Sequence, residues 1–339
     1  MQPFAAAKNA IPINPSGSKI LGVISAELEL VEHELKDQAG SNIEVINYLG
    51  DYLRSSGGKR IRPALLILST YAAGGNASKE NVIRLAAVME MLHTATLVHD
   101  DIIDNADTRR NRPSINARFG NQAAVLMGDW LYMSAFETAL SERSLEILDI
   151  LTSLTRLMTE GEIIQMTTVG RLDISEEQYF DILKRKTAYL FSACCEIGAI
   201  LAGASPAAQA GLREYGMNLG IAFQLADDLL DITSDDAKIG KAAGSDLLEG
   251  KVTLPLIRLR EIQPEMQTYL EQIVLDGDYR SLSRERLNKM LDENSILRDI
   301  KHLADDYSAK ARADLEALPV SEYRTCLDDV LSFVVERSS

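Results

Sequence analysis

Two short clusters of aspartate are the clearest candidates for chemistry in this chain. Each has the pattern Asp-Asp-x-x-Asp, and their members are Asp100, Asp101 and Asp104, then Asp227, Asp228 and Asp231. On a helix, a spacing of four residues places the first and last aspartate of each cluster on one face, about one turn apart. One such cluster alone is usually a solvated acidic face. Here, however, two copies end the two most apolar segments of the chain.

Carboxylate ligands without cysteine or histidine suit a hard cation. Mg²⁺ typically keeps water in its coordination shell and shares that shell with substrate phosphates. Two facing carboxylates about 4 Å apart repel each other by roughly 4 kcal/mol at an effective dielectric near 20, so a positive charge is needed between them. The pattern therefore predicts Mg²⁺ and a diphosphate held between two helices.

Basic residues that could bind phosphate oxygens flank both clusters. Arginine offers a fork of donors that fits phosphate, and lysine acts as a point charge. The Gly-Gly pair of GGKRIRP at 57–63 also lets the backbone approach an anion closely. A GGKR turn alone is more often a solvated loop, but the arginines that follow the first cluster favour an anion site. The candidates are Lys59, Arg62, Arg109, Arg110, Arg112, Lys186, Lys241 and Lys251.

The elements that must position these residues are helices. Apolar residues recur at helical spacing through most of the chain, and no alternating run predicts a strand. Segments 85–103 and 216–232 are apolar on nearly every side, which places them at the centre of a bundle. The sequence predicts an all-α, single-domain helical bundle over 19–339, preceded by a flexible segment, 1–18. Helix breaks are expected at 55–58, 72–78, 105–114, near 170, at 203–206 and over 233–250.

Composition excludes several classes of protein. The 339 residues carry 50 acidic and 35 basic side chains, a net charge of −15. This balance argues against nucleic acid as a partner, because duplex binding depends on Lys and Arg. The three cysteines have no CxxC spacing, so we expect reduced thiols and no zinc site. No signal peptide and no apolar run of about 18 residues is found, so we expect a cytoplasmic protein that does not span a membrane.

Together, these motifs resemble the trans-polyprenyl diphosphate synthase family, and most of all its bacterial long-chain octaprenyl, heptaprenyl and solanesyl members. The resemblance implies the all-α isoprenoid synthase fold with a central active-site cavity. It also implies head-to-tail (1′-4) condensation of isopentenyl diphosphate with an allylic diphosphate, giving an all-trans polyprenyl diphosphate. The matching segments are GGKRIRP at 57–63, HDDIIDNADTRR at 99–110, GExxQ at 161–165, Lys186-Thr187, FQLADDLLDI at 223–232 and GKAAGSDLLEGKVTLPL at 240–256.

The resemblance further implies a role for each site residue. The Mg²⁺ ligands would be Asp100, Asp104 and Asp227, holding three ions when substrate is bound, with Asp101, Asp228 and Asp231 in support. The allylic diphosphate would be bound by Arg109, Lys186, Lys241 and Lys251, with Thr187 and Gln224 beside the reacting carbons. Isopentenyl diphosphate would be bound by Gly58, Lys59, Arg62, His93 and Arg110.

Product length is predicted from the residues just before the first cluster. Ala95 and Thr96 lie five and four residues before Asp100, where short-chain members of the family often carry a bulky aromatic residue. Two small residues predict an open tunnel and a long, octaprenyl-like product. The alternative is a short geranyl, farnesyl or geranylgeranyl product, with the stop set deeper by Met91, Leu92, Met127 or Met133.

Two other classes of protein stay open at this point. A class I terpene cyclase shares the fold and one aspartate cluster, but it has no use for a second cluster or for GGKRIRP. A non-catalytic regulatory subunit would be expected to lack some motif aspartates or arginines, and none is missing here. As the family implies, we expect a homodimer, with peripheral membrane contact as a possible route for product release.

Overall fold

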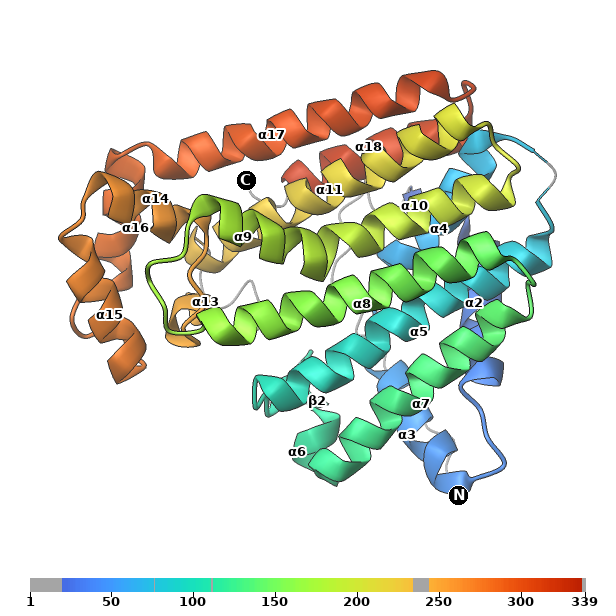
Figure 1. The fold of residues 1–339 in the computed structure, drawn as a ribbon, viewed down its shortest axis with the longest axis horizontal. Helices are drawn as coiled ribbons and strands as arrows, with labels where there is room; N and C mark the ends of the chain where they lie inside the picture. Colours follow the sequence, from blue (N-terminus) through green and yellow to red (C-terminus); the bar gives the residue numbers. More distant parts are fainter. Residues whose placement is uncertain (1–19, 76, 111, 234–243, 337–339) are drawn as a thin grey trace.

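The computed structural model describes residues 20–75, 77–110, 112–233 and 244–336, and Figure 1 shows how its helices are arranged. The predicted flexible segment 1–18 and the predicted ligand Lys241 lie outside the described residues. The first helices are α2 (Ser25–Gln38), α3 (Glu44–Ser55), α4 (Ile61–Ala73), α5 (Lys79–Ile103), α6 (Ile115–Phe119), α7 (Asn121–Leu140) and α8 (Leu145–Thr168). They are followed by α9 (Glu176–Leu183), α10 (Tyr189–Leu201), α11 (Pro206–Thr233), α13 (Ser245–Leu248), α14 (Leu254–Ile262), α15 (Met266–Asp276), α16 (Arg284–Glu293), α17 (Ile296–Asp314) and α18 (Glu322–Glu336).

The two predicted apolar segments lie in α5 and α11, the longest of the described helices. α5 packs against α4 and α7, and α11 packs against α10 and α17. α10 also contacts α4 and α8, so the long helices run side by side as one bundle (Figure 1). The predicted all-α fold is confirmed, and the predicted helix breaks that fall on described residues are found. The structure also has breaks that were not predicted, at 39–43, 141–144, 263–265, 277–283 and 318–321.

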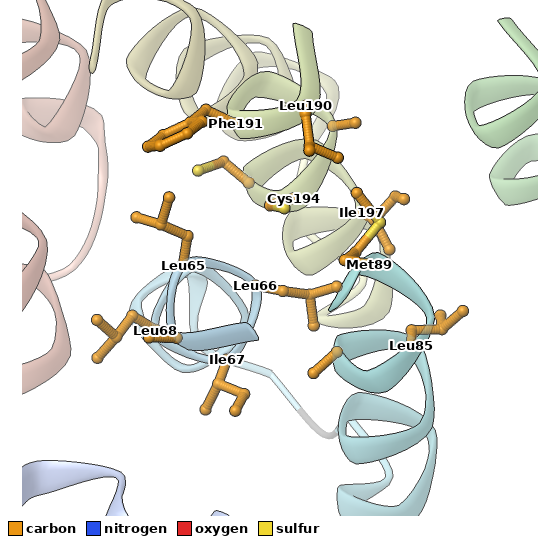
Figure 2. Close-up of a cluster of buried hydrophobic side chains, with 14 of the residues drawn as sticks. Leu65, Leu66, Ile67, Leu68, Leu85, Met89, Leu190, Phe191, Cys194 and Ile197 are labelled. Carbon is orange, nitrogen blue, oxygen red and sulfur yellow. The ribbon is translucent and has the colours of Figure 1, made fainter. Parts of the chain in front are cut away.

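The centre of the bundle is a continuous apolar core. Leu65 and Leu66 of α4 meet Met89 of α5 and Phe191 and Ile197 of α10, as Figure 2 shows. Each of these side chains is at most 1% exposed. Burying a side chain of this size contributes about 1.5–3 kcal/mol to stability. The core therefore fixes α5 relative to α10, and through α10 it also fixes α11.

Glycine allows α10 and α11 to approach closely. Gly216 and Gly220 are four residues apart on α11, so they share one face. A Cβ atom at Gly216 would lie 2.6 Å from the carbonyl oxygen of Phe191, and one at Gly220 would lie 2.6 Å from Cα of Ala188. Neither distance is possible for a real side chain, so the position of α11 in the bundle depends on both glycines.

A second apolar core anchors the helices that follow α11. It joins Leu225 and Leu229 of α11 to Tyr179 and Leu183 of α9 and to apolar residues of α14, α15, α16 and α17. α14, α15 and α16 lie at one end of the molecule in Figure 1, and α17 runs from that end along the bundle. This second core holds the returning chain, including α13 and Lys251, against the C-terminal end of α11.

Two local features depart from the simple helical pattern. Thr108–Arg109 (β1) and Arg112–Pro113 (β2) form a two-stranded antiparallel hairpin directly after the first aspartate cluster. A π-helical turn, Lys184–Ala188, lies between α9 and α10 and interrupts the α-helical pattern around Lys186. Apolar periodicity reports neither feature, because a two-residue strand and a single widened turn are too short to change it.

α5 alone among the described helices is long and apolar enough to cross a membrane. Its apolar window is 67% buried within the protein, as expected for a helix at the centre of a bundle. Cys194 and Cys195 are fully buried in α10 and Cys326 is 4% exposed in α18.

Candidate active site

Both aspartate clusters lie at the C-terminal ends of the central helices, and their six side chains form two groups. One group is accessible: it consists of the half-buried Asp100 and the exposed Asp104 and Asp227. The other is at most 4% exposed and consists of Asp101, Asp228 and Asp231. The accessible group contains the three residues predicted to hold metal, and the buried group contains the three predicted to support them.

Each buried aspartate is held by hydrogen bonds. Arg109 donates to Asp101 Oδ1 from Nε at 2.8 Å and from Nη2 at 2.7 Å. Asp231 accepts from the Ser245 hydroxyl at 3.2 Å and from a backbone amide of α13. These bonds satisfy the buried carboxylates and tie the hairpin and the returning chain to the ends of α5 and α11. Arg109, predicted to bind the allylic diphosphate, thus also anchors the first cluster.

A cleft of about 260 Å³ opens beside the second cluster. Across it, Lys251 Nζ lies 3.0 Å from Oδ2 of Asp104 and 2.9 Å from Oε2 of Glu249. This ion pair links the end of α5 to the segment after α13, so the two clusters face a common space. The polar residues that line the cleft are Gln165, Thr168, Tyr179, Lys186, Thr187, Gln224, Asp227, Asp228, Asp246, Lys251 and Thr253.

The π-helical turn presents Lys186 and Thr187 to this cleft. Lys186 Nζ donates to the Gln165 side chain and lies 2.9 Å from Oε1 of Glu162, both on α8. The Thr187 hydroxyl donates to Oε1 of Gln224 on α11 at 2.9 Å. Neighbouring residues of the turn thereby reach two different helices. π-turns of this kind are frequent at functional sites.

Glycines on both sides make room for the wide turn. A Cβ atom at Gly161 on α8 would lie 2.7 Å from Cβ of Arg185, and Gly220 on α11 faces Ala188 in the same way. The glycine of the GExxQ motif is therefore explained by packing. The motif glutamine, Gln165, is explained by its contact with Lys186.

The electrostatics of the first cluster favour a bound cation. Burial raises the pKa of Asp100 to about 7, and the nearby carboxylates of Glu162 and Asp104 raise it further, while Lys186 and Arg109 oppose the rise. A cation at these oxygens would favour the charged form. Among the described residues, no three Asp, Glu, His or Cys side chains lie close enough to form a complete metal site. The accessible aspartates therefore fit a hard cation whose shell is completed by water and substrate oxygens, and they do not fit a closed protein cage.

A second group of basic residues gathers around α5, on the side of the GGKRIRP loop. A Cβ atom at Gly58 would lie 2.8 Å from Nη1 of Arg60 and 3.1 Å from Nη1 of Arg110, so the loop and the hairpin meet at this glycine. The half-buried side chain of Arg62 packs against the ring of Phe191, with Cζ 5.2 Å from the ring centroid. Its buried Nε has no hydrogen-bond partner in the described part of the chain, so this site lacks an acceptor that an anion would supply.

His93 lies among the same guanidinium groups. Burial, followed by the positive charges of Arg62 and Arg110, lowers the pKa of His93 well below its usual value, so the ring is neutral at pH 7. Gly58, Arg62, His93 and Arg110 are thus brought together as predicted. Nζ of Lys59, the fifth predicted residue, lies 5.9 Å from the ring centroid of Phe333 on α18.

Sequence analysis missed the acidic partner of this group. Glu90, 5% exposed in the middle of α5, accepts a hydrogen bond of 2.7 Å from Nη1 of Arg60. Arg60 also donates to Glu32 of α2, and it adopts a left-handed backbone conformation, with φ of 50°. The available signal was a single carboxylate inside a helix that is otherwise apolar on every side, because such a charge is stable only when paired.

The two residues predicted to set product length point in different directions. Thr96 is half-buried and precedes Asp100 by four residues, so both lie on one face of α5. Ala95 precedes Asp100 by five residues, which rotates it about 140° away. It is fully buried among Val98, Met127 and Leu131, facing α7. Of the deeper candidates, Met91, Leu92 and Met127 are buried, whereas Met133 is 62% exposed.

Comparison with known proteins identifies the family. Residues 43–291 match the family model described as polyprenyl synthetase. The octaprenyl diphosphate synthase of Escherichia coli (strain K12) is 39% identical over 322 residues, covering 94% of this chain and 98% of that protein. The crystal structure of a decaprenyl diphosphate synthase from Rhodobacter capsulatus has a TM-score of 0.89 and 31% identity, covering 95% of this chain and 99% of that chain.

A second solved structure carries ligands. A polyprenyl synthase from Caulobacter crescentus CB15, complexed with calcium and isoprenyl diphosphate, has a TM-score of 0.88 and 34% identity, covering 97% of this chain and 100% of that chain. The isoprenoid synthase fold and the family resemblance inferred from the motifs are both confirmed by these matches. This chain belongs to the polyprenyl synthetase family.

Proposed function

We propose that this enzyme condenses isopentenyl diphosphate with an allylic diphosphate, head to tail, and builds a long all-trans polyprenyl diphosphate. The observation that carries this proposal is the pairing of two differently charged sites on α5. Asp227 lines the cleft, and Asp104 pairs with Lys251 of the cleft lining. A group of arginines gathers around His93, which precedes Asp100 by seven residues and so lies on nearly the same face of α5. In that group the buried Nε of Arg62 has no hydrogen-bond partner among the described residues. Two diphosphates, one bound through cations and one bound directly by basic side chains, require these two environments.

The allylic diphosphate belongs at the aspartate cleft. Asp100, Asp104 and Asp227 would hold Mg²⁺, which supplies Lewis-acid stabilisation of the departing diphosphate. Lys186 and Lys251 already lie beside acidic residues of the cleft and would bind the remaining oxygens. Such fixed positive charges stabilise the anion as the C–O bond breaks, without reorganisation of the site. We include Lys241 and Arg109 in this set on the family pattern.

Isopentenyl diphosphate belongs at the arginine group. Arg62 and Arg110 offer forked donors that match phosphate oxygens. The neutral His93 ring can accept or donate a hydrogen bond there without adding charge. Gly58 leaves room between the two guanidinium groups of Arg60 and Arg110. Lys59 would have to turn from Phe333 toward the ligand.

The reaction itself needs few protein groups. The electron pair of the allylic C–O bond leaves with the diphosphate, and the isopentenyl double bond then attacks the allylic cation. The attack leaves a tertiary cation at C3 of the isopentenyl unit. Loss of a proton from the adjacent C2 then forms the new double bond, and the released diphosphate is a suitable acceptor for that proton. Thr187 and Gln224 place oxygen dipoles beside this cation, and the apolar walls of the bundle keep water from it.

We propose a long product because the residue one turn before Asp100, on the same face of α5, is the small and half-buried Thr96. The names of the long-chain relatives support this choice over the short-chain alternative. A Thr96→Phe variant should shorten the main product. Ala95→Tyr serves for comparison: its site is fully buried, so it should lower the melting temperature whatever it does to length. An unchanged product length from Thr96→Phe would show that Thr96 does not influence chain length.

We further propose that the enzyme is a homodimer joined through α7 and α8. Leu126, Met133 and Leu140 repeat every seven residues along α7 and are 69%, 62% and 48% exposed, so they form one apolar stripe. Ile163 and Met166 of α8 are more than half exposed as well. Light scattering should give twice the chain mass, and Met133→Glu should give a monomer. A wild-type monomer would contradict this assignment.

The reaction is tested by incubating the purified chain with labelled isopentenyl diphosphate and farnesyl diphosphate. Incorporation should require both substrates and Mg²⁺, and it should stop when EDTA is added. Hydrocarbon released from the allylic substrate alone would instead indicate a terpene cyclase. Turnover that appears only after a second protein is added would indicate a regulatory subunit.

A further inference from the structure

A chain of three hydrogen bonds runs from the cleft into the second apolar core. The Thr187 hydroxyl donates to Oε1 of Gln224 at 2.9 Å, and Nε2 of Gln224 donates to Oδ1 of Asp228 at 2.8 Å. The Tyr179 hydroxyl then donates to Oδ2 of Asp228 at 2.6 Å. All four residues line the cleft, and Tyr179 and Asp228 are its buried members, at 6% and 3% exposed.

The donors in this chain leave little freedom of orientation. A tyrosine hydroxyl has one hydrogen, and Tyr179 directs it to Asp228. Burial raises the pKa of Asp228 to about 8, whereas the hydrogen bonds from Tyr179 and Gln224 lower it and so favour the ionised form. The ionised carboxylate accepts on both oxygens, so the amide of Gln224 must turn its nitrogen toward it. A flipped amide would set a carbonyl oxygen against a carboxylate oxygen. The Gln224 carbonyl oxygen therefore faces Thr187 and takes the only hydroxyl hydrogen of that residue.

The orientation of the Thr187 hydroxyl determines which end of its dipole faces the reacting carbons. With its hydrogen committed to Gln224, Thr187 can offer only oxygen lone pairs to the cleft. An oxygen held in that orientation presents the negative end of its dipole to a developing cation, and fixed dipoles stabilise a transition state better than freely rotating ones. A hydroxyl released from Gln224 could instead turn its hydrogen toward the cation, which would oppose the reaction.

We propose that Tyr179 is a positioning residue for this reaction, acting through Asp228 and Gln224 to fix the orientation of the Thr187 hydroxyl. The inference rests on the proposed function, because it assigns the cleft to the allylic cation. Tyr179 comes from α9, and its ring packs in the second apolar core with Leu183. The packing of the ring therefore fixes the position of the Tyr179 hydroxyl. Through Asp228 and Gln224, the hydrogen bonds then fix the orientation of the Thr187 hydroxyl.

The test is Tyr179→Phe, which removes one oxygen atom and keeps the ring. We expect kcat to fall about tenfold, the effect of one hydrogen bond to a charged group, while both KM values change less than about twofold. Tyr215→Phe is the matched control. Tyr215 is also fully buried, but its hydroxyl donates to the carbonyl of Leu327 in α18, far from the cleft lining. It should lose a similar amount of stability and keep the wild-type kcat.

Combining variants distinguishes positioning from a structural role. If Tyr179 acts through Thr187, the double variant Tyr179→Phe/Thr187→Val should lose no more kcat than Thr187→Val alone. Losses that multiply, or a wild-type kcat in Tyr179→Phe, would overturn the proposal. Should Tyr179→Phe not fold, Asp228→Asn breaks the same chain and should show the same drop, and a wild-type kcat there would equally overturn it. A wild-type enzyme that does not incorporate isopentenyl diphosphate would contradict the proposed function instead.

Discussion

Lys251 Nζ lies 3.0 Å from Oδ2 of Asp104, although 147 residues separate them in the chain. Asp104 is the last member of the first aspartate cluster, and Lys251 follows the second cluster. The contact therefore brings together the two halves of the site. It also places the positive charge of Lys251 beside a carboxylate that is predicted to hold Mg²⁺, where the ammonium group could bind a diphosphate oxygen.

Lys251→Gln should weaken binding of the allylic substrate. The variant removes a positive charge from the cleft, so we expect the KM for the allylic diphosphate to rise about tenfold and the KM for isopentenyl diphosphate to stay constant. Steady-state kinetics with each substrate varied in turn measures both values. Lys289→Gln is the control, because Lys289 is exposed on α16. An unchanged allylic KM in Lys251→Gln would contradict the assignment.

Glu90→Gln should act on the other substrate. Glu90 holds Arg60 by an ion pair of 2.7 Å and offsets the positive charge on Arg62 and Arg110. Without that carboxylate the guanidinium groups repel and move apart, so we expect the KM for isopentenyl diphosphate to rise about tenfold.

The matched control for Glu90 is Glu142→Gln. The Glu142 side chain is 3% exposed and pairs with Arg84 at 2.7 Å, so both variants break a buried ion pair. Each should lower the melting temperature, but Glu142→Gln should leave both KM values unchanged. If the two variants lose stability alike and neither changes KM, Glu90 has no part in substrate binding.

His93 should make the folded protein less stable in mild acid. Its pKa is held well below the ordinary value of 6.5, while the unfolded chain keeps a value close to 6.5. Below about pH 6.5 the imidazole of His93 binds a proton in the unfolded state but not in the folded state. The contribution of His93 to the free energy of unfolding is therefore present above about pH 6.5 and lost as the pH falls. The loss between about pH 6.5 and 5.5 is about 1 kcal/mol.

The measurement is thermal unfolding at about pH 7.5 and about pH 5.5. Between these two pH values the melting temperature of the wild type should fall by a few degrees more than that of His93→Gln. His33→Gln serves as the control, because His33 is exposed to solvent on α2. Equal losses in the wild type and in His93→Gln would show that His93 is not held neutral in the folded protein.

Gly220→Ala should destabilise the protein and slow the reaction. The new methyl group would meet Cα of Ala188 at 2.6 Å, so α11 and the π-turn must move apart. Overpacking of this kind costs about 1–3 kcal/mol. The displacement also carries Thr187 away from Gln224, so kcat should fall together with the melting temperature. Gly22→Ala, where a Cβ atom would meet nothing within 4 Å, should be neutral or stabilising; a neutral Gly220→Ala would contradict the close packing.

The sequence was sufficient to predict the elements that carry the site. Asp100 and Asp227 could be placed because α5 and α11 are apolar on nearly every side, which only central helices are. Gly58, Arg62 and Arg110 could be grouped because the first aspartate cluster and the GGKRIRP loop match one family pattern in one order. Composition alone gave no sign of this site, because a net charge of −15 for the whole chain conceals these local groups of arginine.

What could not be predicted depends on contacts between distant segments. The π-turn at Lys186 is a change of hydrogen-bond register inside an apparently regular helix, and it is visible in sequence only through the glycines of neighbouring helices. The pairing of Glu90 with Arg60 joins α5 to a loop 30 residues away. Ala95 and Thr96 were treated as equivalent, although one residue of helix rotation separates the cleft face from the α7 face.

The length of the wild-type product tests the central claim most directly. Purified enzyme, farnesyl diphosphate as primer, excess labelled isopentenyl diphosphate and Mg²⁺ should give, after dephosphorylation and separation by chain length, an octaprenyl-like main product. That result requires both diphosphate sites to work together and the path below Thr96 to be open. A main product that stops at geranylgeranyl or shorter, or no incorporation of label at all, would contradict it.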